Sequence, residues 1–201
     1  MARPQKISSE EIEAAARAVF VEHGPSAPVS MIAKRLGVTH AALFQRVGSK
    51  AALLRLALGS GKPDGLERLL AEPPTDGVRE ALITTLGQLM GFLRRLVPNL
   101  VVRKAAGMPL SETSPTPLGV PPPLLLRRLL ASWLERGVAG GQIPTVDSHA
   151  AAEGLLGAME ARCFNAYLGG AEYAPGNDTD FLTTMVDGLI FDRPRPTSQP
   201  T

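Results

Sequence analysis

Apolar residues recur at helical spacing from the eighth residue onward. In the first such stretch they share one helix face: Ile12, Ala15, Ala16, Val19 and Phe20. Ser8 and Glu11 have the spacing of a capping box, which satisfies free backbone donors at a helix start. Gly24 followed by Pro25 is typical of a helix end. The pattern predicts a first helix between Ser8 and Gly24.

Three shorter helices are predicted before residue 59. Apolar positions mark a two-turn helix over 29–36, then short helices over 40–46 and 50–58. Thr39 and Ser49 precede the last two helices and are candidate N-caps. Gly37 separates the first two, and the sequence from Gly59 to Pro63 is typical of a linker.

The rest of the chain is also predicted to be helical. The expected helices cover residues 66–70, 77–97, 100–106, 124–138, 148–168 and 179–191. Pro98 should close or kink the long helix, and six prolines predict a loop over 107–123. The proline-rich tail is predicted to be disordered. The sequence therefore predicts an all-α chain with one domain over 1–58, another over 64–191, and a tail over 192–201.

Charge is distributed unevenly along this chain. Residues 1–62 hold nine Lys and Arg against four Glu, a net charge of +5, whereas residues 63–201 carry −3. A basic front suits contact with a polyanion, although chance variation of surface charge remains an alternative. The single cysteine, Cys163, excludes an intramolecular disulfide. With no signal-like segment and no apolar run of membrane-spanning length, the chain is expected to be soluble and cytoplasmic, without membrane contact.

Residues 29–50 satisfy the requirements of a helix-turn-helix. Ala33 is small enough for a close helix crossing, and Gly37 tolerates the positive φ of the turn. Apolar residues are spaced to lock the unit from inside: Ile32, Leu36, Val38, Leu43 and Val47. A generic three-helix bundle has similar spacing and stays open as an alternative. The basic flank, formed by Lys34, Arg35, Arg46 and Lys50, favours DNA binding.

The same segment resembles the signature of the TetR family of transcriptional regulators. The matching positions, in order and spacing, are Ile32-Ala33, Gly37-Val38-Thr39, Leu43-Phe44, Ser49-Lys50 and Leu53-Leu54. The resemblance covers roughly residues 8–58 and implies an N-terminal three-helix helix-turn-helix DNA-binding domain. It also implies a C-terminal helical domain for ligand binding and dimerisation.

The resemblance assigns roles to single residues. It implies phosphate contacts from Phe44, Arg46 and Lys50, base or sugar contacts from His40 and Ala41, and a backbone contact from Ser30. Gln45 and His40 can also hydrogen-bond to base edges. The candidate DNA-binding set is Ser30, Thr39, His40, Ala41, Phe44, Gln45, Arg46 and Lys50. The chain departs from the family pattern where Pro28 replaces threonine, Phe44 replaces tyrosine and Val47 replaces phenylalanine.

Two candidate sites lie in the second domain. A homodimer that binds a palindromic operator on double-stranded DNA needs a dimer interface. The residues expected in that interface are Ala150, Gly154, Gly157, Ala158, Ala161, Phe181, Met185 and Leu189. A pocket for a small, uncharged hydrophobic effector is expected at Leu86, Met90, Leu93, Trp133, Met159, Cys163, Phe164 and Tyr167. Both sets have a plain alternative, which is burial inside the monomer.

The sequence bears on three hypotheses about function. The favoured hypothesis is a DNA-binding dimer, most often a repressor in this family, released from its operator by the effector. The alternative is a DNA-binding dimer without such an effector, controlled by a protein partner or constitutive. An enzyme is not expected, because His23, His40 and His149 are scattered and no nucleophile or phosphate-binding motif is present. No cofactor or metal is expected.

Overall fold

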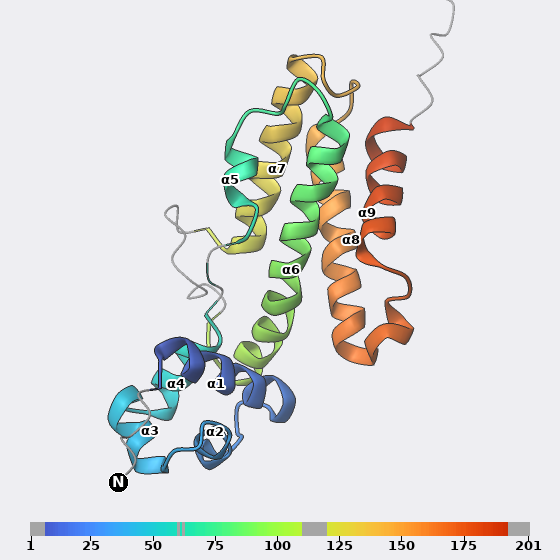
Figure 1. Cartoon of the computed structure of the whole chain (residues 1–201). Helices are drawn as coiled ribbons and strands as arrows, with labels where there is room; N and C mark the ends of the chain where they lie inside the picture. The colour runs from blue at the N-terminus through green and yellow to red at the C-terminus, as the bar shows by residue number, and fades with distance from the viewer. Residues whose placement is uncertain (1–6, 60, 62, 110–119, 193–201) are drawn as a thin grey trace, which may run out of the picture. The chain divides into compact units, whose positions relative to one another are not determined.

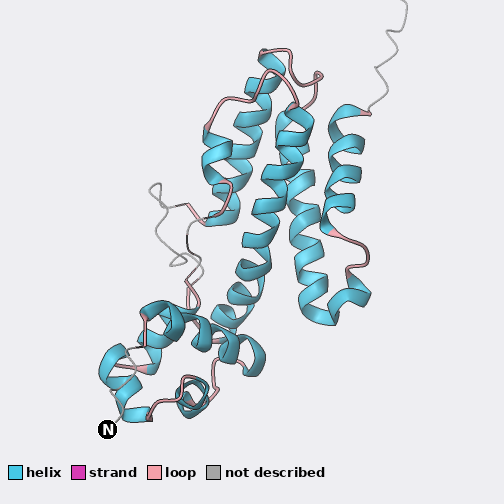
Figure 2. Ribbon diagram, in the orientation of Figure 1, coloured by secondary structure: helices cyan, strands magenta, loops and turns pink. Residues whose placement is uncertain are grey.

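The protein folds into helices joined by loops. The computed structural model describes residues 7–59, 61, 63–109 and 120–192, and none of these residues lies in a strand (Figure 2). The all-α fold class is therefore confirmed. The chain divides into two compact units, one with residues 1–61 and 98–119 and the other with 62–97 and 120–201. The expected domain limits stay a prediction, and the predicted tail, apart from Asp192, lies outside the described residues.

Four helices form the N-terminal part of the first unit (Figure 1). They are α1 (Ser9–His23), α2 (Val29–Arg35), α3 (His40–Val47) and α4 (Lys50–Ala57). The capping box is confirmed: the Ser8 hydroxyl accepts from Glu11 N at 3.1 Å, and the Glu11 carboxylate accepts from Ser8 N at 2.7 Å. The predicted caps Thr39 and Ser49 are confirmed as well, each accepting from a backbone N–H at 3.1 Å. Local capping chemistry thus sets the starts of three helices.

The core of this unit joins all four helices. Its buried members on α1 are the five predicted residues, Ile12, Ala15, Ala16, Val19 and Phe20. They pack in one cluster with Ile32, Ala33, Leu43 and Leu53. Arg17 adds a polar link, because its Nε donates to the Ala57 carbonyl at the end of α4 over 3.0 Å. Burial and this hydrogen bond together fix α1 on α4.

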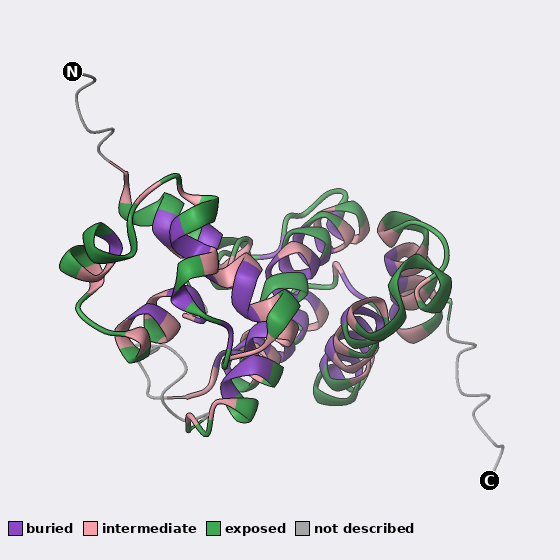
Figure 3. Ribbon diagram, turned by 90° about the horizontal axis from the view of Figure 1, so that it is seen from below, coloured by how far each residue is buried: buried purple, intermediate pink, exposed green. Residues whose placement is uncertain are grey.

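The second unit is built mainly from long helices. Its elements are α5 (Leu66–Leu70), residues 78–97 of α6 (Val78–Ala105), α7 (Pro122–Ala139), α8 (Ser148–Gly169), a 3-10 turn (Gly170–Tyr173) and α9 (Asp178–Val186), which continues into a π-helical turn (Asp187–Phe191). Helices α6 to α9 lie side by side, and their buried residues face their neighbours (Figures 1 and 3). The turn after α9 packs on α8.

Two helices differ from expectation at prolines. Pro98 does not close the long helix, which was one of the two effects expected of it: α6 continues through Pro98 to Ala105 and includes most of the helix expected over 100–106. Proline there removes one hydrogen bond, but apolar residues stay buried on both sides of it, including Leu96 and Val102. The predicted loop over 107–123 ends earlier, because Pro122 starts α7, where a missing N–H costs nothing. Residues 110–119 lie outside the described part.

A buried cation organises the start of α9. Arg162 on α8 is 8% exposed, and its guanidinium donates to the Pro175 carbonyl at 3.0 Å and the Gly176 carbonyl at 2.8 Å. Its Nε also donates to the Asp178 carboxylate at 3.0 Å. Arg94 on α6 donates to the same carboxylate from Nη2 at 2.7 Å. Asp178 therefore joins three helices through two arginines.

Those hydrogen bonds set the charge of Asp178. Burial alone raises its pKa, but the bonds from Arg94 and Arg162 outweigh burial and hold the pKa below its ordinary value. A carboxylate with a lowered folded-state pKa stabilises the fold above the unfolded value of about 3.9. This contribution is lost as the pH falls through the folded-state pKa.

Asp178→Asn is expected to lower the free energy of unfolding by about 2 kcal/mol at pH 7, because Arg162 keeps its burial and loses its anion. The difference from the wild type should shrink as the pH falls below about 4, because Asp178 is protonated first in the unfolded chain and, at lower pH, in the folded protein. Urea denaturation at pH 7 and pH 3 measures both. Asp76→Asn, at an exposed carboxylate, is the matched control, and equal stability of the two variants at pH 7 would contradict this role of Asp178.

Candidate nucleic-acid interface

A tight turn fixes the angle between α2 and α3. The Leu36 N–H donates to the Ile32 carbonyl at 3.0 Å, and the Val38 N–H donates to the Ala33 carbonyl at 3.0 Å. Gly37 lies between them with φ of 68°, a backbone conformation that glycine adopts without strain. Ala33 is buried, as a close helix crossing requires. The predicted helix-turn-helix geometry is therefore present.

Helix α3 is attached to the unit by one face. Leu43 is its single buried residue, at 2% exposure. The remaining positions of the expected reading face are accessible: His40, Ala41, Gln45 and Arg46 are exposed and Phe44 is half-buried. A short helix with one buried side chain presents most of its surface to a partner. Its width suits the major groove of DNA.

His40 and Phe44 form a pair on this face. Their ring centroids lie 4.5 Å apart with an interplanar angle of 53°. Phe44 also packs against the core of the unit, so its ring is shared between the interior and the surface. Because Phe44 has no hydroxyl, it can position His40 but cannot hydrogen-bond to a phosphate. The contact therefore favours a supporting role for Phe44.

Two cations flank α3. Nη1 of Arg46 donates to the Ile7 carbonyl, which ties α3 to the residues before α1. A guanidinium has five N–H donors, so others remain for phosphate. Lys50 begins α4, is half-buried, and has no hydrogen-bond or ion-pair partner among the described residues. Both side chains can neutralise phosphates without carrying sequence information.

The other expected contacts lie at helix starts. Ser30 is exposed in the first turn of α2, where Pro28 provides no side-chain cap. The exposed Thr39 hydroxyl accepts from the Ala42 N–H as a cap and can still donate its own hydrogen to a phosphate. The structure thus places all eight candidate DNA-binding residues at exposed or half-buried positions of α2–α4.

Lys34 and Arg35 belong to the basic flank but not to the eight residues predicted to contact DNA. Both are exposed in the last turn of α2. They lie between Glu22 and Asp64, and the residues between those two carboxylates include no Asp or Glu. That one-sided charge was the available signal, and it marks helices α2–α4 as the basic part of the unit.

The helical segment around this turn is similar to one known protein family. The sequence profile described as "Bacterial regulatory proteins, tetR family" matches residues 12–57. The matched stretch contains α2, α3 and the turn between them, which together form the helix-turn-helix. Comparison with curated proteins gives no match.

Solved structures show the same fold over nearly the whole chain. A TetR-like transcriptional regulator from Rhodococcus sp. RHA1 has 21% identity and a TM-score of 0.62, covering 94% of this chain and 98% of its own. A TetR transcription regulator from Haloarcula marismortui has 18% identity and a TM-score of 0.60, with coverages of 90% and 97%. GusR from Salmonella enterica has 22% identity and a TM-score of 0.59, with coverages of 90% and 94%. At these identities the likeness shows the fold alone.

The residues predicted for an effector pocket divide into two groups. Six of the eight are in the core of the second unit: Leu86, Met90, Leu93, Trp133, Met159 and Cys163. Tyr167 is half-buried, and Phe164 is 43% exposed on α8. Burial raises the pKa of the Cys163 thiol to about 11, and its sulfur lies 3.4 Å from that of Met90. A thiol held protonated in this way suits packing and not redox sensing.

The residues predicted for a dimer surface lie on α8, α9 and the turn after it. Ala150 and Ala161 are exposed, whereas the other six are half-buried: Gly154, Gly157, Ala158, Phe181, Met185 and Leu189. Phe164 and Leu168 continue the α8 strip at helical spacing and are also exposed. This side of α8 is thus apolar and accessible within the single chain.

The described residues lack two further kinds of feature. They contain no group of three or more His, Cys, Asp or Glu side chains that could hold a metal ion. They also contain no helix that is both long enough and apolar enough to cross a membrane.

Lys50→Ala is expected to weaken binding to all DNA sequences alike and to reduce the slope of log affinity against log salt by about one per protomer. The reason is the loss of one phosphate contact. Fluorescence anisotropy with several duplexes at four salt concentrations measures both. Arg55→Ala, at an exposed α4 position outside the candidate set, is the control. A change of sequence preference in Lys50→Ala would assign this lysine to base reading instead.

Proposed function

We propose that this protein is a homodimeric repressor of the TetR family that binds a palindromic operator and leaves it when a small, mainly hydrophobic ligand binds. The observation that carries the proposal is the surface of α3, where one buried leucine leaves the polar and charged side chains accessible. His40 and Gln45 are placed to discriminate bases, a good bidentate contact being worth about 1–3 kcal/mol. Arg46 and Lys50 would set the register of the protein on the duplex.

Dimerisation follows from how little DNA one α3 helix can read. Eight residues span about 12 Å, which is a few base pairs. Two copies related by a twofold axis read two half-sites and gain specificity. The accessible apolar side of α8 supports the partner surface, because small side chains at Gly157 and Ala161 let two helices approach closely. Leu189 lies against Gly154, so the turn after α9 would form part of the same surface.

Release by a ligand requires a difference in affinity between two conformations of the dimer. A ligand that binds more tightly to the form whose α3 helices are spaced wrongly for the operator would lower operator affinity. The operator would lower the affinity for the ligand by the same factor. The helical second unit provides the apolar surroundings for such a ligand. Repression is proposed because it is the common outcome of operator binding in this family.

Selection of bound sites from random double-stranded DNA is expected to enrich a palindrome. Its half-site centres should lie about one helical turn, or a multiple of that, apart, because the two α3 helices bind the same face of the duplex. Sequencing after several rounds measures the enrichment, with the Gln45→Ala variant run in parallel and expected to relax one position of each half-site. Enrichment of a single asymmetric half-site would contradict the dimer, and no enrichment would contradict sequence-specific binding.

Ala161→Arg is expected to convert the dimer into a monomer, since two long charged side chains would face each other across the twofold axis. Light scattering after gel filtration measures the mass, and operator affinity should fall together with it. His149→Arg is the control. His149 is exposed on α8, and its side chain leaves the helix about 120° around the axis from that of Ala161. A dimeric Ala161→Arg protein would place the partner surface elsewhere.

A further inference from the structure

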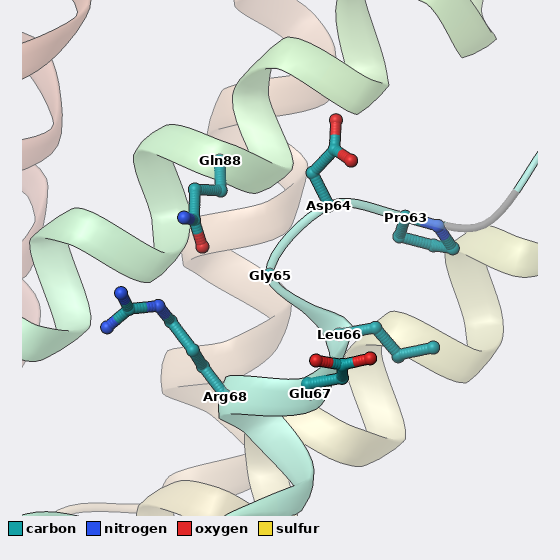
Figure 4. Close-up of a pocket in the computed structure, with 7 residues that line it drawn as sticks. All are labelled: Pro63, Asp64, Gly65, Leu66, Glu67, Arg68 and Gln88. Atoms are coloured by element: carbon teal, nitrogen blue, oxygen red, sulfur yellow. The ribbon is translucent and has the colours of Figure 1, made fainter.

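Two neighbouring cavities in the second unit have Arg68 in common. The first, of about 330 Å³, is lined by Asp64, Gly65, Arg68 and Gln88, among others (Figure 4). The second, of about 210 Å³, is lined by Arg68, Ala81, Thr85 and Trp133, among others. Neither cavity includes any of the residues that the sequence predicted for an effector pocket, with the exception of Trp133.

The floor of both cavities is one face of α6. Ala81, Thr85 and Gln88 follow each other at helical spacing on that face. Gly65 brings the start of α5 close to it: a Cβ on Gly65 would lie 3.1 Å from Gln88 Oε1 and 3.3 Å from the Thr85 carbonyl. Gly65 also has φ of 84°. The segment from Gly65 to Arg68 is therefore held against α6 and closes the side of the cavities.

Arg68 differs from the other charged side chains that line the cavities, because those side chains have partners. Asp64 pairs with Arg95 at 3.0 Å, Glu72 pairs with Arg136 at 3.2 Å, and Glu67 has an interaction of its own. Arg68 has no hydrogen-bond or ion-pair partner within the described ranges. Its guanidinium extends from α5 toward α6 and the Gln88 amide, whereas the Glu67 carboxylate lies beside Leu66 (Figure 4). A guanidinium in this setting is free to bind a carboxylate.

The second cavity adds an apolar compartment. Its apolar lining is Ala71, Pro74, Ala81 and Trp133, which is 3% exposed, and its polar lining is Arg68, Thr85 and Glu72, whose carboxylate pairs with Arg136. The Trp133 indole N–H donates no hydrogen bond to any residue that the structure describes. A dry cavity of about 150 Å³ is enough to hold a benzene ring. The compartment thus has room for a single ring, with a cation at its boundary.

We propose that the paired cavities bind a small organic acid with one ring, its carboxylate on Arg68 and its ring beside Trp133. This inference rests on the proposed function in identifying that acid as the effector. It changes one expectation from the sequence: the ligand is mainly apolar, but it carries a negative charge. A carboxylate also has two acceptor oxygens, which match the fork of a guanidinium and leave the ring free to enter the apolar compartment.

The test uses benzoate as the probe and the intrinsic fluorescence of the protein as the signal. Trp133 is the single tryptophan of the chain, so a change in emission reports on this compartment. Benzoate is expected to change the emission in a saturable way below about 10 mM, and benzamide, of the same shape without the charge, to bind at least about tenfold more weakly. Calorimetric titration measures the same affinities without relying on fluorescence.

Two variants separate the roles of charge and space. Arg68→Gln should weaken benzoate at least about tenfold and leave benzamide unchanged. Arg128→Gln is the control, because Arg128 is exposed on α7, has no described partner and lines neither cavity. Ala81→Leu should abolish binding of both probes by filling the apolar compartment, with an unfolding midpoint that shows the protein remains folded.

The outcomes distinguish this inference from the proposed repressor. Equal benzoate affinity in Arg68→Gln and Arg128→Gln, or no binding of benzoate to the wild type, overturns the site while operator binding stands. Benzoate binding that depends on Arg68 but leaves operator affinity unchanged supports the site and contradicts its role as the effector site. Loss of both Arg68-dependent binding and sequence-specific DNA binding would overturn both.

Discussion

Helix α3 is too short to be stable alone, and the DNA-binding function depends on how it is held. Isolated helices below about 12–15 residues are marginal in water, and α3 has eight. Leu43 supplies its one fully buried contact, and burial of a leucine stabilises by about 1.5–3 kcal/mol. Thr39 caps its first turn, and Gly37 and Gly48 allow the chain to turn sharply at either end. Because Leu43, with the partly buried Phe44 and Val47, carries the packing, the exposed side chains of α3 are free to contact DNA.

The features that sequence predicted well are those decided by neighbouring residues. The caps Ser8, Thr39 and Ser49 act over three residues, so their spacing is visible in the chain. Pro98 shows the opposite case. Its local effect predicts an interruption, but burial of Leu96 and Val102 on either side offsets one lost hydrogen bond. No local pattern reports that balance, because it depends on residues distant in sequence.

The sites of the second unit were harder to predict for a related reason. Helix α8 is apolar around most of its circumference, so periodicity did not separate the buried Met159 from the exposed Phe164. Likewise, Arg162 finds its partners at Pro175, Gly176 and Asp178, beyond the end of its own helix. Arg68 gives no signal at all in the sequence. It stands out because the nearby carboxylates of Asp64 and Glu72 pair with other arginines, which is visible only in three dimensions.

Helix α6 gives the two proposed activities a common element. Ala81, Thr85 and Gln88 near its start line the cavities, and Val102 near its end belongs to the core of the first unit. Coupling between two sites is typically worth 1–3 kcal/mol. Arg68 is exposed, and an exposed ion pair contributes about 0.2–1 kcal/mol. A carboxylate on Arg68 would therefore supply part of such a coupling, provided that it binds better in one arrangement of α5 and α6 than in the other, and contacts of the ring would have to supply the rest.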